Sequence, residues 1–231
     1  MTEPNPRQNL TFASNGGQAH GYLAKPASGS GPGVIVVQEW WGLDDHMADI
    51  VDRFAAEGFV TLAPDLFGGR VAHDADTAGK YMSELPPEDA ARDLGGAVDY
   101  LVADGSVTSS KVGVVGFCMG GAFALALAGQ QGDRIGAAVA FYGVGSIPND
   151  FSGIAAPVQG HYGQRDEFYP VEQARAQEQQ MNQQTQNSVE FHYYDAGHAF
   201  HNDKDKLGTY DADLAKLAWS RTVEFLRTNL A

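Results

Sequence analysis

The sequence predicts an α/β fold in which a mostly parallel central sheet carries helices on both faces. Short apolar runs alternate with helix-like segments along most of the chain, which is typical of strands joined by crossover helices. Two further apolar runs, residues 10–13 and 20–25, precede the first helix-like segment, so we expect an antiparallel pair at one edge of the sheet. The 231 residues contain no composition break or long linker, so we expect one domain over residues 1–231.

The hydrophobic pattern gives the expected elements in order. Helix-like segments show apolar residues at helical spacing, and one ends at Gly58 while another begins with Pro87. Residues 65–86 contain three glycines and mixed charges without core periodicity, so we expect a partly ordered loop there, over the functional site. The expected strands cover residues 34–37, 59–62, 112–115, 135–142, 157–162 and 189–194, and the expected helices cover residues 47–57, 87–103, 119–130, 171–184 and 211–229.

Charge and composition argue against several classes of protein. There are 29 acidic and 15 basic side chains, and the formal net charge of −14 disfavours nucleic acid and anionic membrane surfaces as partners. The first residues lack the apolar segment of a secretory signal, and no uncharged apolar stretch reaches the roughly 18 residues of a membrane span. We therefore expect a soluble, cytoplasmic protein that binds a small molecule, with a monomer expected rather than a homodimer.

The chain has a single cysteine, and it lies in the pentapeptide G-F-C-M-G, residues 116–120, between an expected strand and an expected helix. In the serine version of this motif, the strand-to-helix turn presents a nucleophile above the sheet, and the glycines let strand and helix pack closely. One cysteine cannot form an intramolecular disulfide or a Cys-based zinc site. A buried cysteine can also be a packing residue, but the flanking glycines favour Cys118 as a reactive thiol.

Two later residues are candidate partners for Cys118. Asp166 follows the expected strand 157–162, and His198 follows the expected strand 189–194, so both lie at the sheet edge where α/β active sites collect. A thiol nucleophile needs a base beside it, and a carboxylate usually orients that base. The chain order of nucleophile, acid and histidine is the order found in α/β-hydrolases. Asp166 could instead cap the helix expected at residues 171–184.

Several motifs together resemble the dienelactone hydrolase family of the α/β-hydrolase superfamily over nearly the whole chain. The resemblance implies a triad of Cys118, His198 and Asp166 and no cofactor. It implies a carboxylic ester hydrolase, similar to carboxymethylenebutenolidase, that cleaves a small lactone or ester through an acyl-thioester intermediate. The motifs are Q-E-W-W-G at 38–42, P-D-L at 64–66, G-F-C-M-G-G at 116–121, F-Y-G-V-G at 141–145, the segment 163–166 and A-G-H-A-F at 196–200.

Glu39 needs a role because it follows the strand 34–37, where burying a carboxylate without a partner is unfavourable. The resemblance implies that Glu39 holds the resting thiol until substrate displaces it, which would limit oxidation of Cys118. A surface or capping carboxylate is the alternative. The resemblance also implies an oxyanion hole formed by the backbone N–H groups of Met119 and Trp40. The residues expected to bind substrate are Tyr142, Phe117, Trp41, Phe200 and Asn202.

Other functions stay open at this point. His198 and His201 are three residues apart, but no further ligand at suitable spacing supports a metal site. Asn202 stands where the family has an arginine for the substrate carboxylate, so specificity for an anionic lactone does not follow. The alternatives are a promiscuous esterase or thioesterase acting on activated esters, and an α/β-hydrolase domain that binds a ligand without catalysis.

Overall fold

An eight-stranded sheet forms the centre of the structure, a computed structural model that describes residues 5–143 and 150–231. The strand order is β1-β2-β4-β3-β5-β6-β7-β8. β1 and β2 are antiparallel, β2 is antiparallel to β4, and the remaining neighbours are parallel. This confirms the expected mostly parallel sheet with an antiparallel N-terminal edge. The strands are β1 (Leu10–Ser14), β2 (Gly17–Ala24), β3 (Gly33–Val37), β4 (Val60–Pro64), β5 (Val112–Phe117), β6 (Ile135–Phe141), β7 (Val158–Gly163) and β8 (Val189–Tyr194).

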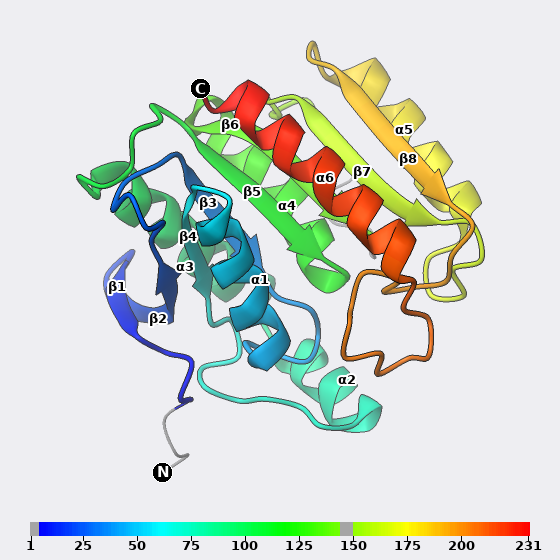
Figure 1. Cartoon of the computed structure of the whole chain (residues 1–231), viewed down its shortest axis with the longest axis horizontal. Coiled ribbons are helices and arrows are strands. Elements are labelled where there is room, and N and C mark those ends of the chain that lie inside the picture. Colours follow the sequence, from blue (N-terminus) through cyan, green and yellow to red (C-terminus); the bar gives the residue numbers. More distant parts are fainter. Residues whose placement is uncertain (1–4, 144–149) are drawn as a thin grey trace.

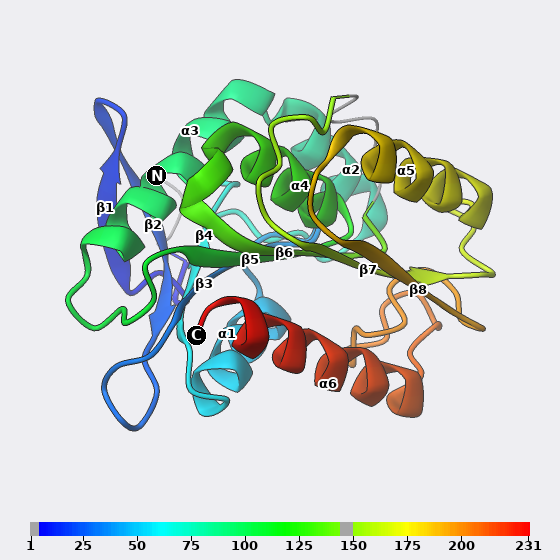
Figure 2. The same cartoon turned by 90° about the horizontal axis from the view of Figure 1, so that it is seen from above.

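Helices cover both faces of the sheet, as the alternating pattern predicts (Figure 2). α1 (Asp45–Ala56) and α6 (Ala212–Asn229) cover one face, whereas α3 (Pro87–Ala103), α4 (Met119–Gln131) and α5 (Val171–Gln184) cover the other. A short 3₁₀ turn, Gly132–Arg134, links α4 to β6. Because of this double cover, β3, β4, β5 and β6 are buried along their whole length, which explains their continuous apolar sequences. No helix in the described ranges is long and apolar enough to cross a membrane.

Aspartates fix where the two helices on the α1 and α6 face begin. The Asp44 side chain accepts a hydrogen bond from the backbone N–H of Met47 at 3.0 Å, and Asp211 accepts one from Leu214 at the same distance. Each carboxylate satisfies an N–H group that has no partner within the helix and opposes the positive end of the helix dipole. The two helices therefore begin within about two residues of the boundaries predicted from the sequence.

The segment 65–86 contains a helix where a loop was expected. α2 (Ala75–Glu84) is capped by Asp74, which accepts hydrogen bonds from the backbone and hydroxyl of Thr77. Only Ala78 of this helix is fully buried, but apolar residues at 75, 78, 81 and 82 lie at helical spacing, so a short helix signal was present and was missed. α2 lies beyond the carboxyl end of β5, at the lower edge of the molecule in Figure 1.

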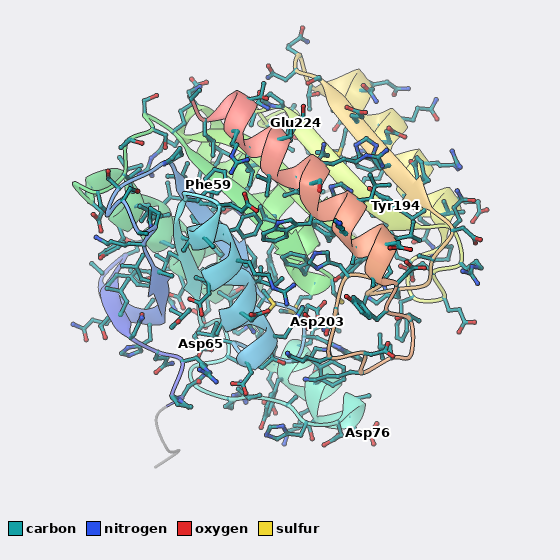
Figure 3. The ribbon with its side chains drawn as sticks, in the orientation of Figure 1. Phe59, Asp65, Asp76, Tyr194, Asp203 and Glu224 are labelled. Carbon is teal, nitrogen blue, oxygen red and sulfur yellow. The ribbon has the colours of Figure 1, made fainter. Side chains whose placement is uncertain are left out.

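The carboxyl ends of the parallel strands meet at one edge of the sheet. Figure 3 shows the direction, because Phe59 and Asp65 lie at opposite ends of β4, and Asp203, from the loop before α6, lies toward the Asp65 end. Ligands of open α/β sheets bind at this edge. Five residues follow strands there and come together in the site described below: Glu39 after β3, Cys118 after β5, Tyr142 after β6, Asp166 after β7 and His198 after β8.

α4 packs so closely on the sheet that two glycines of the G-F-C-M-G motif have no room for a side chain. A Cβ on Gly116 would lie 1.9 Å from the carbonyl oxygen of Gly120. A Cβ on Gly120 would lie 2.4 Å from the carbonyl oxygen of Val37. The close packing expected from the motif is therefore present. It fixes the position of the turn at Cys118 relative to the ends of the strands.

Gly120→Ala should destabilise the protein by about 1–3 kcal/mol, because the added methyl group forces α4 away from the end of β3. Gly79→Ala is the matched control, since Gly79 lies in α2 and a Cβ there would meet no atom within 4 Å. We expect this control to stabilise by about 0.5–1 kcal/mol. Urea unfolding of both variants measures the difference, and equal effects would contradict the packing described for α4.

Candidate active site

Cys118 occupies a strained turn between β5 and α4. Its backbone has φ 54° and ψ −122°, a conformation that residues with a side chain seldom adopt. Two main-chain hydrogen bonds hold the turn: the N–H of Cys118 donates to the carbonyl of Phe141 at 3.0 Å, and the N–H of Gly121 donates to the carbonyl of Cys118 at 2.8 Å. The Cys118 residue is only 7% exposed. The turn thus holds a nearly buried thiol at the end of a central strand.

The three residues expected to act together are in hydrogen-bond contact. His198 Nε2 lies 3.2 Å from Cys118 Sγ, and His198 Nδ1 lies 2.7 Å from Asp166 Oδ2. The hydroxyl of Thr209 donates to the carbonyl of His198 and fixes the histidine loop from its other side. This order of contacts, from carboxylate to imidazole to sulfur, can orient the imidazole and activate a thiol.

Asp166 also closes the turn that leads into α5. Its Oδ1 accepts hydrogen bonds from the backbone N–H groups of Phe168 and Tyr169, both at 2.8 Å, while its Oδ2 faces His198. Asp166 does not cap α5, whose N-cap is Pro170 without a side-chain hydrogen bond; it closes the turn before that helix and also contacts His198. Because three groups surround this buried carboxylate, its position is tightly defined.

The surroundings of His198 favour its charged form. Burial alone lowers the pKa of His198, but the hydrogen bonds with Asp166 and Cys118 outweigh this effect and raise the pKa from 6.5 to about 10. At neutral pH the imidazole therefore carries a proton between a carboxylate and a sulfur atom. An imidazolium beside a cysteine is the environment that stabilises a thiolate.

Glu39 lies beside the thiol but is held by other partners. The hydroxyl of Tyr142 donates to Oε1 at 3.0 Å, and the amide of Asn202 donates to Oε2 at 2.6 Å. Glu39 is 1% exposed, which rules out the alternative of a surface carboxylate. Among the contacts of the described residues there is no hydrogen bond between Glu39 and Cys118; the Cys118 Sγ contacts His198 instead.

Tyr142 and Asn202 each donate a hydrogen bond to Glu39. Burial and the nearby Glu39 carboxylate hold the pKa of Tyr142 well above its usual value, so its hydroxyl stays protonated and donates. Asn202 offers no positive charge. The basic side chains beside the site are paired with carboxylates, Arg165 with Asp195 at 2.7 Å and Lys206 with Asp44 at 3.0 Å.

The other predicted site residues are those expected to form the oxyanion hole and those expected to bind substrate. Met119 begins α4 directly after Cys118, and Trp40 follows Glu39, so both lie at the correct edge for the expected oxyanion hole. Trp41 is nearly buried against Trp40, with 5.1 Å between ring centroids. Phe117 and Phe200, which were expected to bind substrate, are fully buried and pack against the aromatic residues Phe141 and Tyr194. Val144 and Gly145, from the motif at 141–145, lie outside the described residues.

Phe168 is a site residue that the sequence analysis missed. Its ring centroid lies 5.0 Å from that of His198 and 6.3 Å from that of Trp40, yet the residue is 57% exposed. The available signal was an apolar side chain in the loop directly after Asp166, where a solvated loop would carry a polar one. Phe168 therefore forms part of the rim of the site.

His201 is separate from this chemistry. It is buried beneath the site, where its ring faces Phe117 and Phe141 at 5.6 and 5.1 Å between centroids. Burial lowers the pKa of His201 to about 3, so the ring is neutral. Within the described ranges, no group of three or more His, Cys, Asp or Glu side chains is placed to hold a metal ion.

Comparisons with known proteins agree with the fold. A model of the dienelactone hydrolase family matches residues 19–230. Protein usf of Aquifex pyrophilus is 37% identical over 96% of this chain and 99% of its own. A carboxymethylenebutenolidase of a Pseudomonas species is 31% identical over 93% of this chain and 92% of its own.

A solved structure gives the same result in three dimensions. The crystal structure of a candidate dienelactone hydrolase from Klebsiella pneumoniae superposes with a TM-score of 0.83 at 29% identity, covering 94% of this chain and 96% of the other. The match to the family model runs from β2 through the last helix of this chain. The chain belongs to the dienelactone hydrolase family of the α/β-hydrolase superfamily.

Proposed function

We propose that the chain hydrolyses small carboxylic esters or lactones by attack of the Cys118 sulfur, through an acyl-thioester intermediate. Its family makes the chain a carboxylic ester hydrolase. The single observation that carries the mechanism is the continuous contact from Asp166 through His198 to Cys118, at 2.7 and 3.2 Å. A sulfur atom so placed has an imidazolium beside it and a carboxylate that holds the imidazolium in orientation.

In the first half of the reaction, the Cys118 thiolate adds to the ester carbonyl carbon. The negative charge that develops on the carbonyl oxygen is stabilised by the backbone N–H groups of Met119 and Trp40. His198 Nε2 then donates its proton to the departing alkoxide oxygen, and the C–O bond breaks. The products of this half are an alcohol, or the free hydroxyl end of an opened lactone, and an acyl group bound to Cys118.

In the second half, His198 is neutral and acts as a base. It takes a proton from a water molecule as the water oxygen adds to the thioester carbonyl, and the C–S bond breaks to release the acid. Cys118 leaves as a thiolate beside the newly formed imidazolium, which restores the starting pair. Asp166 stabilises the positive charge on the imidazole in both halves.

Cys118→Ala should lower kcat/KM for an ester such as methyl butyrate by at least about 1,000-fold, because no other group on the chain replaces the sulfur. The double variant Cys118→Ala/His198→Ala should be little worse than either single variant, since the two residues act as a unit. Steady-state kinetics measure both effects, with Leu217→Ala on the surface of α6 as the control. Full activity in Cys118→Ala would contradict the proposed nucleophile.

We propose that Glu39 controls whether Cys118 is held as a neutral thiol, and that the contacts in this structure favour the state in which Glu39 does not bind the thiol. In the family pattern this glutamate holds the thiol, but here Tyr142 and Asn202 hold it instead, and the sulfur is left to His198. Loss of either of these two hydrogen bonds would leave one Glu39 oxygen without that donor and freer to accept from the thiol. The strength of the Asn202 contact would then decide how often Cys118 is stored as a neutral thiol.

Asn202→Ala should slow alkylation of Cys118 by iodoacetamide several-fold. The freed oxygen of Glu39 can then accept the S–H proton, and a neutral thiol is a poorer nucleophile than a thiolate. Adding Glu39→Gln to this variant should restore the rate, because the neutral amide competes poorly with His198 for the proton. The rates are readily assigned because Cys118 is the only cysteine. An unchanged rate in Asn202→Ala would contradict this role of Glu39.

A further inference from the structure

A cavity of about 620 Å³ opens beside His198. Two loops form it, the one that carries Asp166, between β7 and α5, and the one that carries His198, between β8 and α6. Its walls include Phe168 from the first loop and Thr209 and Tyr210 from the second. A volume of this size accommodates far more than a water molecule or a methyl group, and small-molecule sites fall in the same range.

Two aromatic side chains in this cavity are unusually exposed. Phe168 is 57% exposed and Tyr210 is 40% exposed, although each ring could pack against protein. Exposed large apolar side chains that share one concave surface point to a ligand that covers them. The charged groups there, Arg165, Glu167 and Asp211, accompany the aromatic walls, and Arg165 is already paired with Asp195. Two of these three groups are acidic and the basic one is paired, so the cavity disfavours an anion.

The positions that the two substrate oxygens must take indicate which part of the substrate this cavity binds. In the tetrahedral intermediate, the oxygen that leaves must lie within reach of His198 Nε2, and the negatively charged oxygen must face the N–H groups proposed for Met119 and Trp40. The cavity is lined by the histidine loop and the acid loop. Among the residues that the structure describes, His198 lines it, whereas Cys118, Met119 and Trp40 do not. The group attached to the leaving oxygen, which must lie near His198, is therefore the part of the substrate nearest to the cavity.

We propose that this cavity is the binding site for the alcohol portion of the substrate, and that it takes an aromatic alcohol, with the ring between Phe168 and Tyr210. The inference rests on the proposed thioester mechanism and names its substrate class: esters of arylmethyl or aryl alcohols. The pocket is used in the acylation half only, because the alcohol departs when the acyl group transfers to Cys118. An aromatic alcohol bound in the same pocket can also react with the acyl group on Cys118, in the reverse direction.

The return reaction is acyl transfer to an added aromatic alcohol. The alcohol oxygen adds to the thioester carbonyl, its proton passes to His198 Nε2, the C–S bond breaks and Cys118 leaves as a thiolate. The product is a new ester in place of the acid. Because the alcohol binds the cavity before it attacks, an arylmethanol should compete with water far better than methanol does at equal concentration.

Methyl and benzyl butyrate test the assignment, because their leaving alkoxides have similar basicity and differ mainly in the ring. We expect kcat/KM to favour the benzyl ester by about tenfold or more, as burial of an aromatic ring predicts. Phe168→Ala and Tyr210→Ala should each reduce this benzyl-to-methyl ratio several-fold. Leu217→Ala removes a side chain of comparable exposure, 43%, on α6, outside the cavity, and should leave the ratio unchanged.

A second readout separates an alcohol site from a general effect on the enzyme. With benzyl alcohol added, the fraction of acyl groups captured as benzyl butyrate should fall in Phe168→Ala and in Tyr210→Ala, while the rate at which water cleaves the thioester should change much less. The assignment would be overturned if these variants changed the preference for acyl chain length and left the benzyl-to-methyl ratio unchanged. A ratio and capture fraction that stay equal to those of the unmodified protein in both variants would also overturn it.

Failure of the thioester mechanism and failure of the alcohol site give different experimental results. If the thioester mechanism is wrong, hydrolysis is absent or survives Cys118→Ala for both esters. If only the alcohol site is wrong, hydrolysis depends on Cys118 but the ratio is insensitive to Phe168 and Tyr210. The two aromatic residues lie on different loops, so each variant serves as an independent check on the folding of the other.

Discussion

The site depends on the strained turn at Cys118. Holding a residue with a side chain at φ 54° costs on the order of 1–3 kcal/mol, and the surrounding structure must supply that energy. It does so through the two hydrogen bonds that fix the turn and through the contact of Gly120 with the end of β3. If α4 could move outward, the turn would relax and the sulfur would leave the reach of His198. The close packing of one helix on the sheet is thus the condition for the chemistry.

A second constraint is electrostatic. Asp166, Glu39 and the Cys118 sulfur lie together in a buried region, and His198 is the one group among them that can carry a positive charge. The hydrogen bonds and charges of Asp166 and Cys118 explain why the pKa of His198 rises although burial alone would lower it. Glu39 needs its two neutral donors, Tyr142 and Asn202, since an unpaired buried carboxylate would be strongly destabilising.

Much of the fold and the triad could be predicted from the sequence, because strand ends and the G-F-C-M-G motif carry local signals. Apolar runs locate the buried strands, and the glycines at 116 and 120 indicate the close approach of α4. α2 was harder to predict, since its apolar pattern at 75, 78, 81 and 82 is short, contains Gly79 and leaves only Ala78 fully buried. The partners of Glu39 were also beyond reach, because they depend on how loops after β6 and β8 meet in space. The full burial of Phe117 and Phe200 was also not predictable, because an aromatic residue beside a motif looks the same in sequence whether it faces the core or the solvent.

The central claim is that Cys118 carries the acyl group, and rapid acid quenching followed by mass spectrometry tests it most directly. The protein is mixed with an excess of benzyl butyrate, quenched during turnover and digested at low pH, where thioesters survive. We expect the mass of one butyryl group on the peptide that contains Cys118, at a level that decays once the ester is consumed. Turnover of the ester with no adduct on that peptide, or with the adduct on a different residue, would contradict the claim.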